Sequence, residues 1–265
     1  MFVKGLYYIL PVALFFCVSC NFNLNKADSK NQRAKIEVKR YDRIESRYLT
    51  TGDFAALQQM NIEYPTETRT LIENVLQIGE VNDYDINSKF LNFYQDTTLQ
   101  SIITDVELSY GDMSDINKRL NDAFARLRKM IPAIDVPYIY SQIGALNQSI
   151  VVGDGSIGIS LDKYLGKDYP LYKRYYNEGQ RKNMTREYII PDCLCFYLLS
   201  VYPMHGQNIR SQYDKNLHIG KILWTVNKAL DKDFFSNKYV SEVARFVQRN
   251  PQVSIDEMLK MGKLS

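Results

Sequence analysis

The sequence of 265 residues is poor in the residue types that most often carry catalysis. It has two histidines, His205 and His218, and neither belongs to the H-E-x-x-H pattern that places two zinc ligands on one helical face. It also contains no G-x-S-x-G motif. We therefore predict no cofactor and no metal, although carboxylates from distant segments could still assemble a site.

The sequence also lacks an apolar run long enough to cross a bilayer. The longest, residues 6–18, would rise only about 20 Å as a helix, against ~30 Å of hydrocarbon. Lys4 precedes this run, and Ser19 and Cys20 follow it, which is the order of a bacterial lipoprotein signal peptide. Cys17 stands where a leucine is usual in that motif.

We therefore predict that residues 1–19 are a signal peptide and that Cys20 carries a diacylglycerol and an amide-linked fatty acid such as palmitate. Residues 20–35 form the lipidated N-terminus and a polar, flexible tether, and residues 36–265 form a globular domain. Two or three acyl chains are enough for lasting attachment to membrane lipid.

Cysteine is scarce as well, with four in the chain. Once Cys17 leaves with the signal peptide and Cys20 is acylated, only Cys193 and Cys195 remain. A C-x-C pair is poorly placed for a disulfide. The mature domain should therefore depend on its apolar core.

Neither sign of charge is in large excess, because the net charge is only +3. Nothing global demands a polyanionic partner, and neither nucleic acid nor a nucleotide is expected to bind. Tyrosine is abundant, with 20 residues. Tyrosines suit partner surfaces but equally suit half-buried core positions.

Periodicity predicts an α+β domain, mostly helical, with a small central antiparallel sheet. A short strand is expected at residues 36–41, another at 136–143, and a hairpin of 148–152 with 157–161. Helices are expected at residues 40–48, 53–60, 66–78, 87–108, 112–131, 185–202, 214–230, 239–249 and 254–261.

Two segments resemble ligand-binding motifs, one for nucleotides and one for calcium, but neither has the surrounding residues that its motif requires. Residues 153–158 match G-x-G-x-x-G, but a strand pattern follows where a phosphate-binding helix would have to begin, so we interpret them as a turn. Residues 83–87 resemble the start of a calcium loop. However, Ser88 replaces the required glycine, and Tyr94 replaces the bidentate glutamate.

A basic, tyrosine-rich segment lies at residues 163–186. Cationic side chains beside aromatic rings suit an anionic partner, here an acidic glycan, lipopolysaccharide or an envelope protein. The alternative is a solvated basic segment with buried tyrosines. The candidate ligand-binding residues are Lys163, Tyr164, Lys167, Tyr172, Lys173, Arg174 and Tyr175.

Residues 159–172, which read ISLDKYLGKDYPLY, resemble the GldB family of gliding-motility lipoproteins of the Bacteroidota. Shorter similarities lie at Pro137-Tyr138-Ile139, at Met184 to Asp192 and at residues 220–223. The resemblance implies an outer-membrane lipoprotein of the cell envelope. It would be a non-catalytic component or accessory of gliding or of type IX secretion, with envelope proteins as partners.

The family is also distantly similar to zinc metallopeptidases of the zincin type, whose zinc helix would fall at residues 191–195. Asp192 would take the place of the glutamate, and Pro191 and Cys195 those of the histidines. This substitution implies an inactive derivative. The alternative function is an envelope hydrolase, degenerate and metallopeptidase-like, that acts on peptide or cell-wall material.

Overall fold

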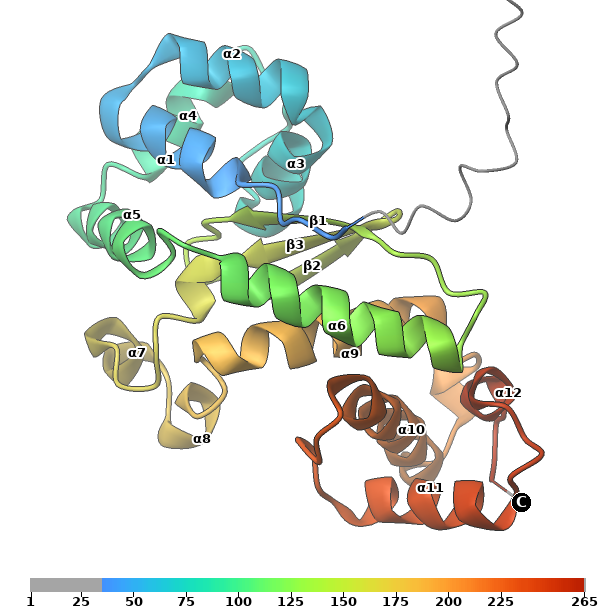
Figure 1. The fold of residues 1–265 in the computed structure, drawn as a ribbon. Helices are drawn as coiled ribbons and strands as arrows, with labels where there is room; N and C mark the ends of the chain where they lie inside the picture. The colour runs from blue at the N-terminus through green and yellow to red at the C-terminus, as the bar shows by residue number, and fades with distance from the viewer. Residues whose placement is uncertain (1–34, 265) are drawn as a thin grey trace, which may run out of the picture. The chain divides into compact units, whose positions relative to one another are not determined.

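Helices dominate the described part of the chain, residues 35–264 of this computed structural model, and a three-stranded sheet lies among them (Figure 1). The predicted mostly helical α+β class is confirmed. From Ile36 to Ser265 the chain forms one compact unit. Within residues 35–264, no helix has both the length and the apolar character needed to cross a membrane. The predicted signal peptide and Cys20 lie outside the described residues.

Several helix boundaries in the first third lie at recognisable capping residues. The Asp53 carboxylate accepts the Ala55 backbone N–H at 2.8 Å, and Gly52, at φ 68°, ends the preceding helix. Asp96 caps two N–H groups at 2.8 and 3.2 Å, so the single helix predicted over 87–108 is in fact two. These elements are α1 (Tyr41–Thr51), α2 (Phe54–Glu63), α3 (Pro65–Arg69), the π-helical turn η1 (Thr70–Leu76), α4 (Ile86–Phe93) and α5 (Thr97–Ser109).

The long helix α6 (Ser114–Met130) follows the predicted amphipathic pattern. Its buried stripe consists of Ile116, Leu120, Ala123, Phe124 and Leu127. The side chains of Asn117 and Asn121 accept the backbone N–H groups of Val38 and Ile36. The strand predicted at 36–41 is therefore an extended segment that makes one bridge to β1, because α6 already satisfies two of its N–H groups.

The sheet consists of β1 (Tyr138–Gln142), β2 (Ile150–Gly153) and β3 (Ser156–Ser160), in the order β1-β3-β2. The hairpin of β2 and β3 is confirmed, but the prediction of an antiparallel sheet is wrong for β1, which runs parallel to β3. The loop at 143–149 carries the chain past the position of β3 to the far edge, and the hairpin then returns β3 beside β1. A Cβ at Gly158 would lie 2.6 Å from the Tyr140 ring, so only glycine fits there.

Helices cover the sheet. Helix α1 packs on β1, whereas α9 (Ile189–Val201) packs on β2 and β3 and contacts α6 (Figure 1). Cys193 and Cys195 are free thiols on α9. Helix α10 (Gln212–Leu230) packs on both α6 and α9. It also contacts the two last helices, α11 (Lys238–Arg249) and α12 (Ile255–Lys260).

Along the chain, short elements connect β3 to α9 and α9 to α10. They are η2 (Leu161–Lys163), α7 (Pro170–Tyr175), α8 (Glu178–Arg181), η3 (Arg186–Tyr188) and η4 (Gln207–Ile209). Half of the basic, tyrosine-rich segment predicted from the sequence lies in the first four of these elements, and the rest lies in the turns between them.

Candidate functional site

The basic segment starts from a buried carboxylate at the end of β3. Asp162 is 0% exposed, and its two carboxylate oxygens accept the backbone N–H groups of Gly144 and Leu146 at 2.8 and 2.5 Å. Ala145 and Leu146 both have positive φ, at 50° and 62°. Asp162 therefore holds the loop after β1 in a backbone conformation that these residue types rarely adopt.

A second buried carboxylate supports the same loop from α1. Glu45 accepts the N–H of Ile143 at 2.9 Å, and the Tyr94 hydroxyl donates to the Ile143 carbonyl at 2.5 Å. Burial raises the pKa of both Glu45 and Asp162. Neither group was singled out from the sequence, because each is an isolated acid whose partner lies on the order of a hundred residues away or in an irregular loop.

Tyrosines fasten the basic segment to the rest of the domain. The Tyr172 hydroxyl donates to the Asp162 carbonyl and accepts the Leu165 N–H. Tyr110 donates to the Tyr164 carbonyl at 2.6 Å. Among the predicted ligand-binding residues, Tyr164 and Tyr172 are therefore buried and bonded within the protein rather than presented to a partner.

Lys163 also points inward. Its ammonium group donates to the Leu146 carbonyl at 3.1 Å and to the Tyr176 hydroxyl at 3.0 Å. The same ammonium lies 4.5 Å from the centre of the Tyr176 ring. Lys163 therefore stabilises the same loop as Asp162, and its ammonium group is already bonded within the protein rather than free for an external ligand.

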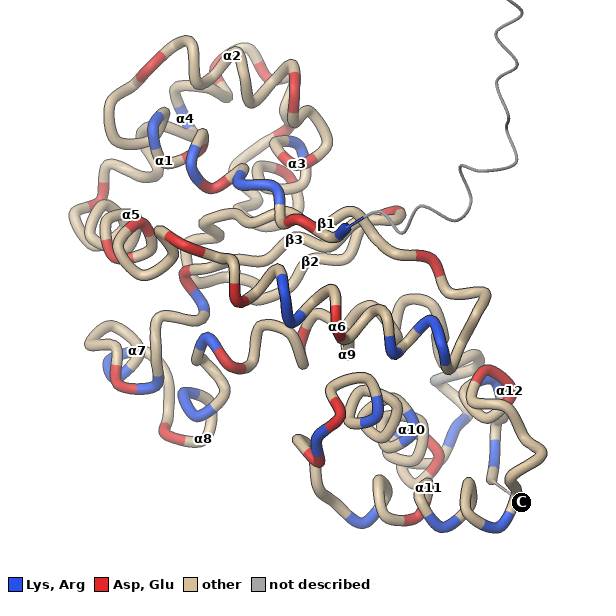
Figure 2. Tube along the Cα trace, in the orientation of Figure 1, with Lys and Arg blue, Asp and Glu red and all other residues tan. Residues whose placement is uncertain are grey.

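The remaining predicted residues face outward on α7 and next to it. Tyr175 is 61% exposed, the Arg174 guanidinium lies 5.7 Å from the centre of its ring, and Lys173 makes a loose pair with Asp168 at 3.5 Å. Blue and red segments alternate along this region in Figure 2. We call the exposed set the α7–α8 surface, and it consists of Lys167, Lys173, Arg174, Tyr175 and Lys182.

A shallow depression of about 700 Å³ adjoins this surface. Lys167, Lys182 and Arg186 supply cations to its wall, and Tyr188 supplies an aromatic ring. Arg186 is already held by both carboxylate oxygens of Asp115, at 3.1 and 2.6 Å. Asp168 and Glu187 also line the depression, so its charge is mixed. The excess of positive charge lies beside it, on the exposed Lys173 and Arg174 of α7.

The helix compared with the zinc helix of metallopeptidases is α9. Tyr164 donates to the Asp192 carboxylate at 2.8 Å, and burial raises the pKa of Asp192 to about 6. Burial, with a smaller contribution from Asp192, also raises the pKa of Cys195. Within residues 35–264, no three histidine, cysteine, aspartate or glutamate side chains are grouped closely enough to hold a metal ion.

The raised pKa of Asp192 predicts a pH dependence of stability. Its folded-state pKa lies above the unfolded value of 3.8, so the carboxyl favours folding at low pH, and this contribution is lost as pH rises through about 6. A pKa shift of one unit corresponds to about 1.4 kcal/mol. Allowing for partial exposure, the free energy of unfolding of Asp192→Asn should rise by about 1–3 kcal/mol relative to that of the wild type between pH 4 and pH 8.

Urea unfolding of both proteins across this pH range measures the difference. Tyr164→Phe is the matched variant, because the Tyr164 hydrogen bond lowers the pKa of Asp192 and its loss should move the midpoint of the difference to higher pH. A difference between wild type and Asp192→Asn that does not change with pH would contradict the raised pKa.

These observations define the class of protein as a mostly helical α+β domain with an exposed basic surface fastened by buried tyrosines and acids. The family described as gliding motility protein GldB matches residues 23–240, most of the chain, and the chain belongs to this family. Membership of this lipoprotein family implies association with the cell envelope and with the gliding machinery. No curated protein and no solved structure matches the chain.

Proposed function

We propose that the protein is an acylated lipoprotein, anchored through Cys20 in the outer membrane, that serves as a non-catalytic component or accessory of the gliding or type IX secretion machinery. Family membership and the order of Lys4, the apolar run 6–18, Ser19 and Cys20 support the anchor. The family match begins at residue 23, after Cys20. The signal sequence therefore supports the anchor independently of the family match.

The α7–α8 surface is the part of the domain best suited to hold a partner. Its cations and Tyr175 are exposed, while the buried tyrosines behind them fix the segment before any partner arrives. A pre-ordered surface loses less conformational entropy on binding than a flexible one. The observation that carries the proposal is this division between a bonded inner face and a cationic outer face.

The partner that this surface fits is an envelope protein with an acidic face. Charge attraction across such an interface mainly speeds association, and it weakens with salt over a screening length of about 10 Å at 0.1 M. Capture of the partner through α7 should therefore decrease in high salt.

The test replaces Lys173 and Arg174 together by glutamate in the full-length, tagged lipoprotein. After cross-linking in intact cells, the amount of each envelope protein recovered with the variant should fall at least about fivefold at low salt, since like charges then face each other. Quantitative mass spectrometry of the captured proteins measures this.

A matched control reverses the same charge elsewhere. Arg245 and Arg249 are exposed on α11, so the double glutamate variant there changes net charge equally without touching α7. Undiminished capture by the Lys173/Arg174 variant, or an equal loss in both variants, would remove the α7–α8 surface from the proposal. Recovery of no envelope protein with the wild type would remove the accessory role itself.

A further inference from the structure

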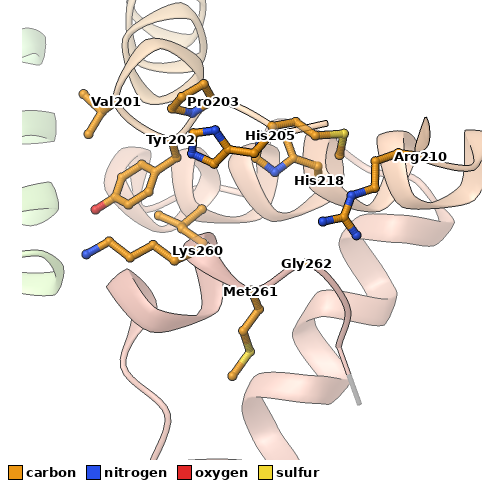
Figure 3. A pocket seen from close by; sticks show the side chains of 11 residues that line it. Val201, Tyr202, Pro203, His205, Arg210, His218, Lys260, Met261 and Gly262 are labelled. Atoms are coloured by element: carbon orange, nitrogen blue, oxygen red, sulfur yellow. The ribbon is translucent and has the colours of Figure 1, made fainter. Parts of the chain in front are cut away.

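A separate pocket lies between the end of α9, the segment before α10, and α12. It encloses about 360 Å³. Figure 3 shows His205 and His218 between Arg210 at one end and Lys260 at the other. Both histidines of the chain therefore line one pocket, although 13 residues separate them in the sequence.

The pocket lining carries positive charge without an acidic residue. Arg210 and Lys260 supply this charge, His205 and His218 add two imidazoles, and the lining contains neither aspartate nor glutamate. Asp256 pairs with Lys260 and accepts the Tyr202 hydroxyl, and Asp214 closes the capping box of α10 with Ser211. Arg210 is therefore the lining cation whose charge no ion pair among residues 35–264 balances.

A buried lysine lies directly behind the wall. Lys221 is 1% exposed, and its ammonium donates to the carbonyls of Leu259 and Met261, which belong to the lining. Burial, and then the charge of Arg210, lower the pKa of Lys221 to about 8. No carboxylate of residues 35–264 forms an ion pair with Lys221 or Arg210.

His218 supplies an unused polar atom. Its side chain is 8% exposed, and Nε2 has no hydrogen-bond partner among the described residues. The carbonyl of Tyr202 is bonded to the imidazole and so accounts for the other ring nitrogen. A buried polar atom without a partner costs free energy, which a ligand that bonds to it would recover.

Two imidazoles could in principle hold a transition metal, but their neighbours oppose it. Arg210 and Lys221 would place two further positive charges near a bound cation. An anion reverses this balance, because it neutralises Arg210 and favours the charged form of His218, whose pKa burial and then the charge of Lys221 otherwise hold below the usual range.

The pocket is not purely polar. Val201, Met204, Leu259 and Met261 provide apolar surface next to the charged groups. A small-molecule site of this kind, apolar with a few convergent polar groups, suits a ligand that combines one charged head with an apolar portion.

We propose that this pocket binds a small organic phosphate, with its phosphate head held by Arg210, His218 and His205 and its apolar substituent on Met204 and Leu259. The site is independent of the proposed anchoring and partner functions. Helix α12, which forms one wall of the pocket, lies outside residues 23–240, so the family match does not cover the whole site.

The test is isothermal titration of the full-length protein in a non-ionic detergent with three probes, namely inorganic phosphate, phenyl phosphate and phenol. We expect saturable binding of one phenyl phosphate per chain, with inorganic phosphate weaker because it lacks the apolar contact. Arg210→Gln should weaken phenyl phosphate about tenfold or more, as expected when a charged hydrogen bond is lost. His218→Gln should also weaken it.

Arg128→Gln is the matched control, because Arg128 is an exposed arginine on α6 outside the pocket and the charge change is identical. Thermal unfolding of each variant verifies that it is folded. Absence of saturable phosphate and phenyl phosphate binding would overturn the proposal. Equal weakening by Arg210→Gln and Arg128→Gln, or phenol binding as tightly as phenyl phosphate, would overturn it too.

Discussion

Replacing Cys20 by alanine should abolish incorporation of fatty acid into the protein altogether. Acylation of a bacterial lipoprotein requires the thiol of the first residue after the signal peptide, and Cys20 is the cysteine at that predicted position. Each buried CH₂ of an acyl chain contributes about 0.8 kcal/mol, so loss of all chains removes the lasting membrane attachment. The measurement is labelling of growing cells with an alkyne-bearing palmitate, followed by capture of the protein.

The neighbouring cysteine gives a close control for this experiment. Cys17 lies three residues earlier, inside the predicted signal peptide, and Cys17→Ala should leave the label unchanged. Sedimentation with membranes does not separate a lipid anchor from an uncleaved signal peptide, because both resist carbonate washing, so the fatty-acid label is the readout. Label retained by the Cys20→Ala protein would mean that the attachment has another origin.

Replacing Asp162 by alanine should destabilise the domain by about 3–5 kcal/mol, a large part of a typical stability of 5–15 kcal/mol. The change leaves the buried N–H group of Gly144 and the half-buried N–H group of Leu146 without acceptors, each at a cost of about 1–3 kcal/mol. Urea unfolding at pH 7 measures the loss.

Two further variants interpret that result. Asp168→Ala removes an exposed acid six residues away whose pair with Lys173 is loose, and it should change stability by less than about 0.5 kcal/mol. Asp162→Asn keeps one acceptor oxygen, so its loss of stability should lie between those of Asp168→Ala and Asp162→Ala. A loss below about 1 kcal/mol for Asp162→Ala would mean that the cost of burying the carboxylate cancels its hydrogen bonds, and that the loop does not depend on them.

The predictions that succeeded depend on residues close to one another in the chain. The turn at residues 153–155 predicted the β2–β3 hairpin, and the apolar spacing of α6 predicted its buried face. Asp53 and Ser254, which begin α2 and α12, are capping residues of ordinary type and position.

The predictions that failed depend on contacts between distant segments. The parallel pairing of β1 with β3 follows from the path of loop 143–149, which Glu45 and Asp162 hold from α1 and from the end of β3. Asp96 is a residue type that commonly caps a helix, and it separates α4 from α5. The apolar pattern continues on both sides of it, so the sequence predicted one helix.

Within the basic segment, residues of the same pattern differ in exposure. Its charges and tyrosines indicated a binding surface, and Lys173, Arg174 and Tyr175 are indeed exposed. Pattern alone does not separate these residues from Tyr164 and Tyr172, because all the tyrosines have the same ring and hydroxyl. Their hydrogen bonds to Asp192 and Leu165 decide which ones are structural.

The central claim is that the mature protein begins at an acylated Cys20, and the mass of its N-terminal tryptic peptide tests this most directly. Trypsin should cut after Lys26, which leaves the short peptide of residues 20–26 on the purified membrane protein. We predict that tandem mass spectrometry finds this peptide with a diacylglyceryl thioether on Cys20. A peptide of the same seven residues with a free thiol, or one that still contains residues before Cys20, would contradict the account.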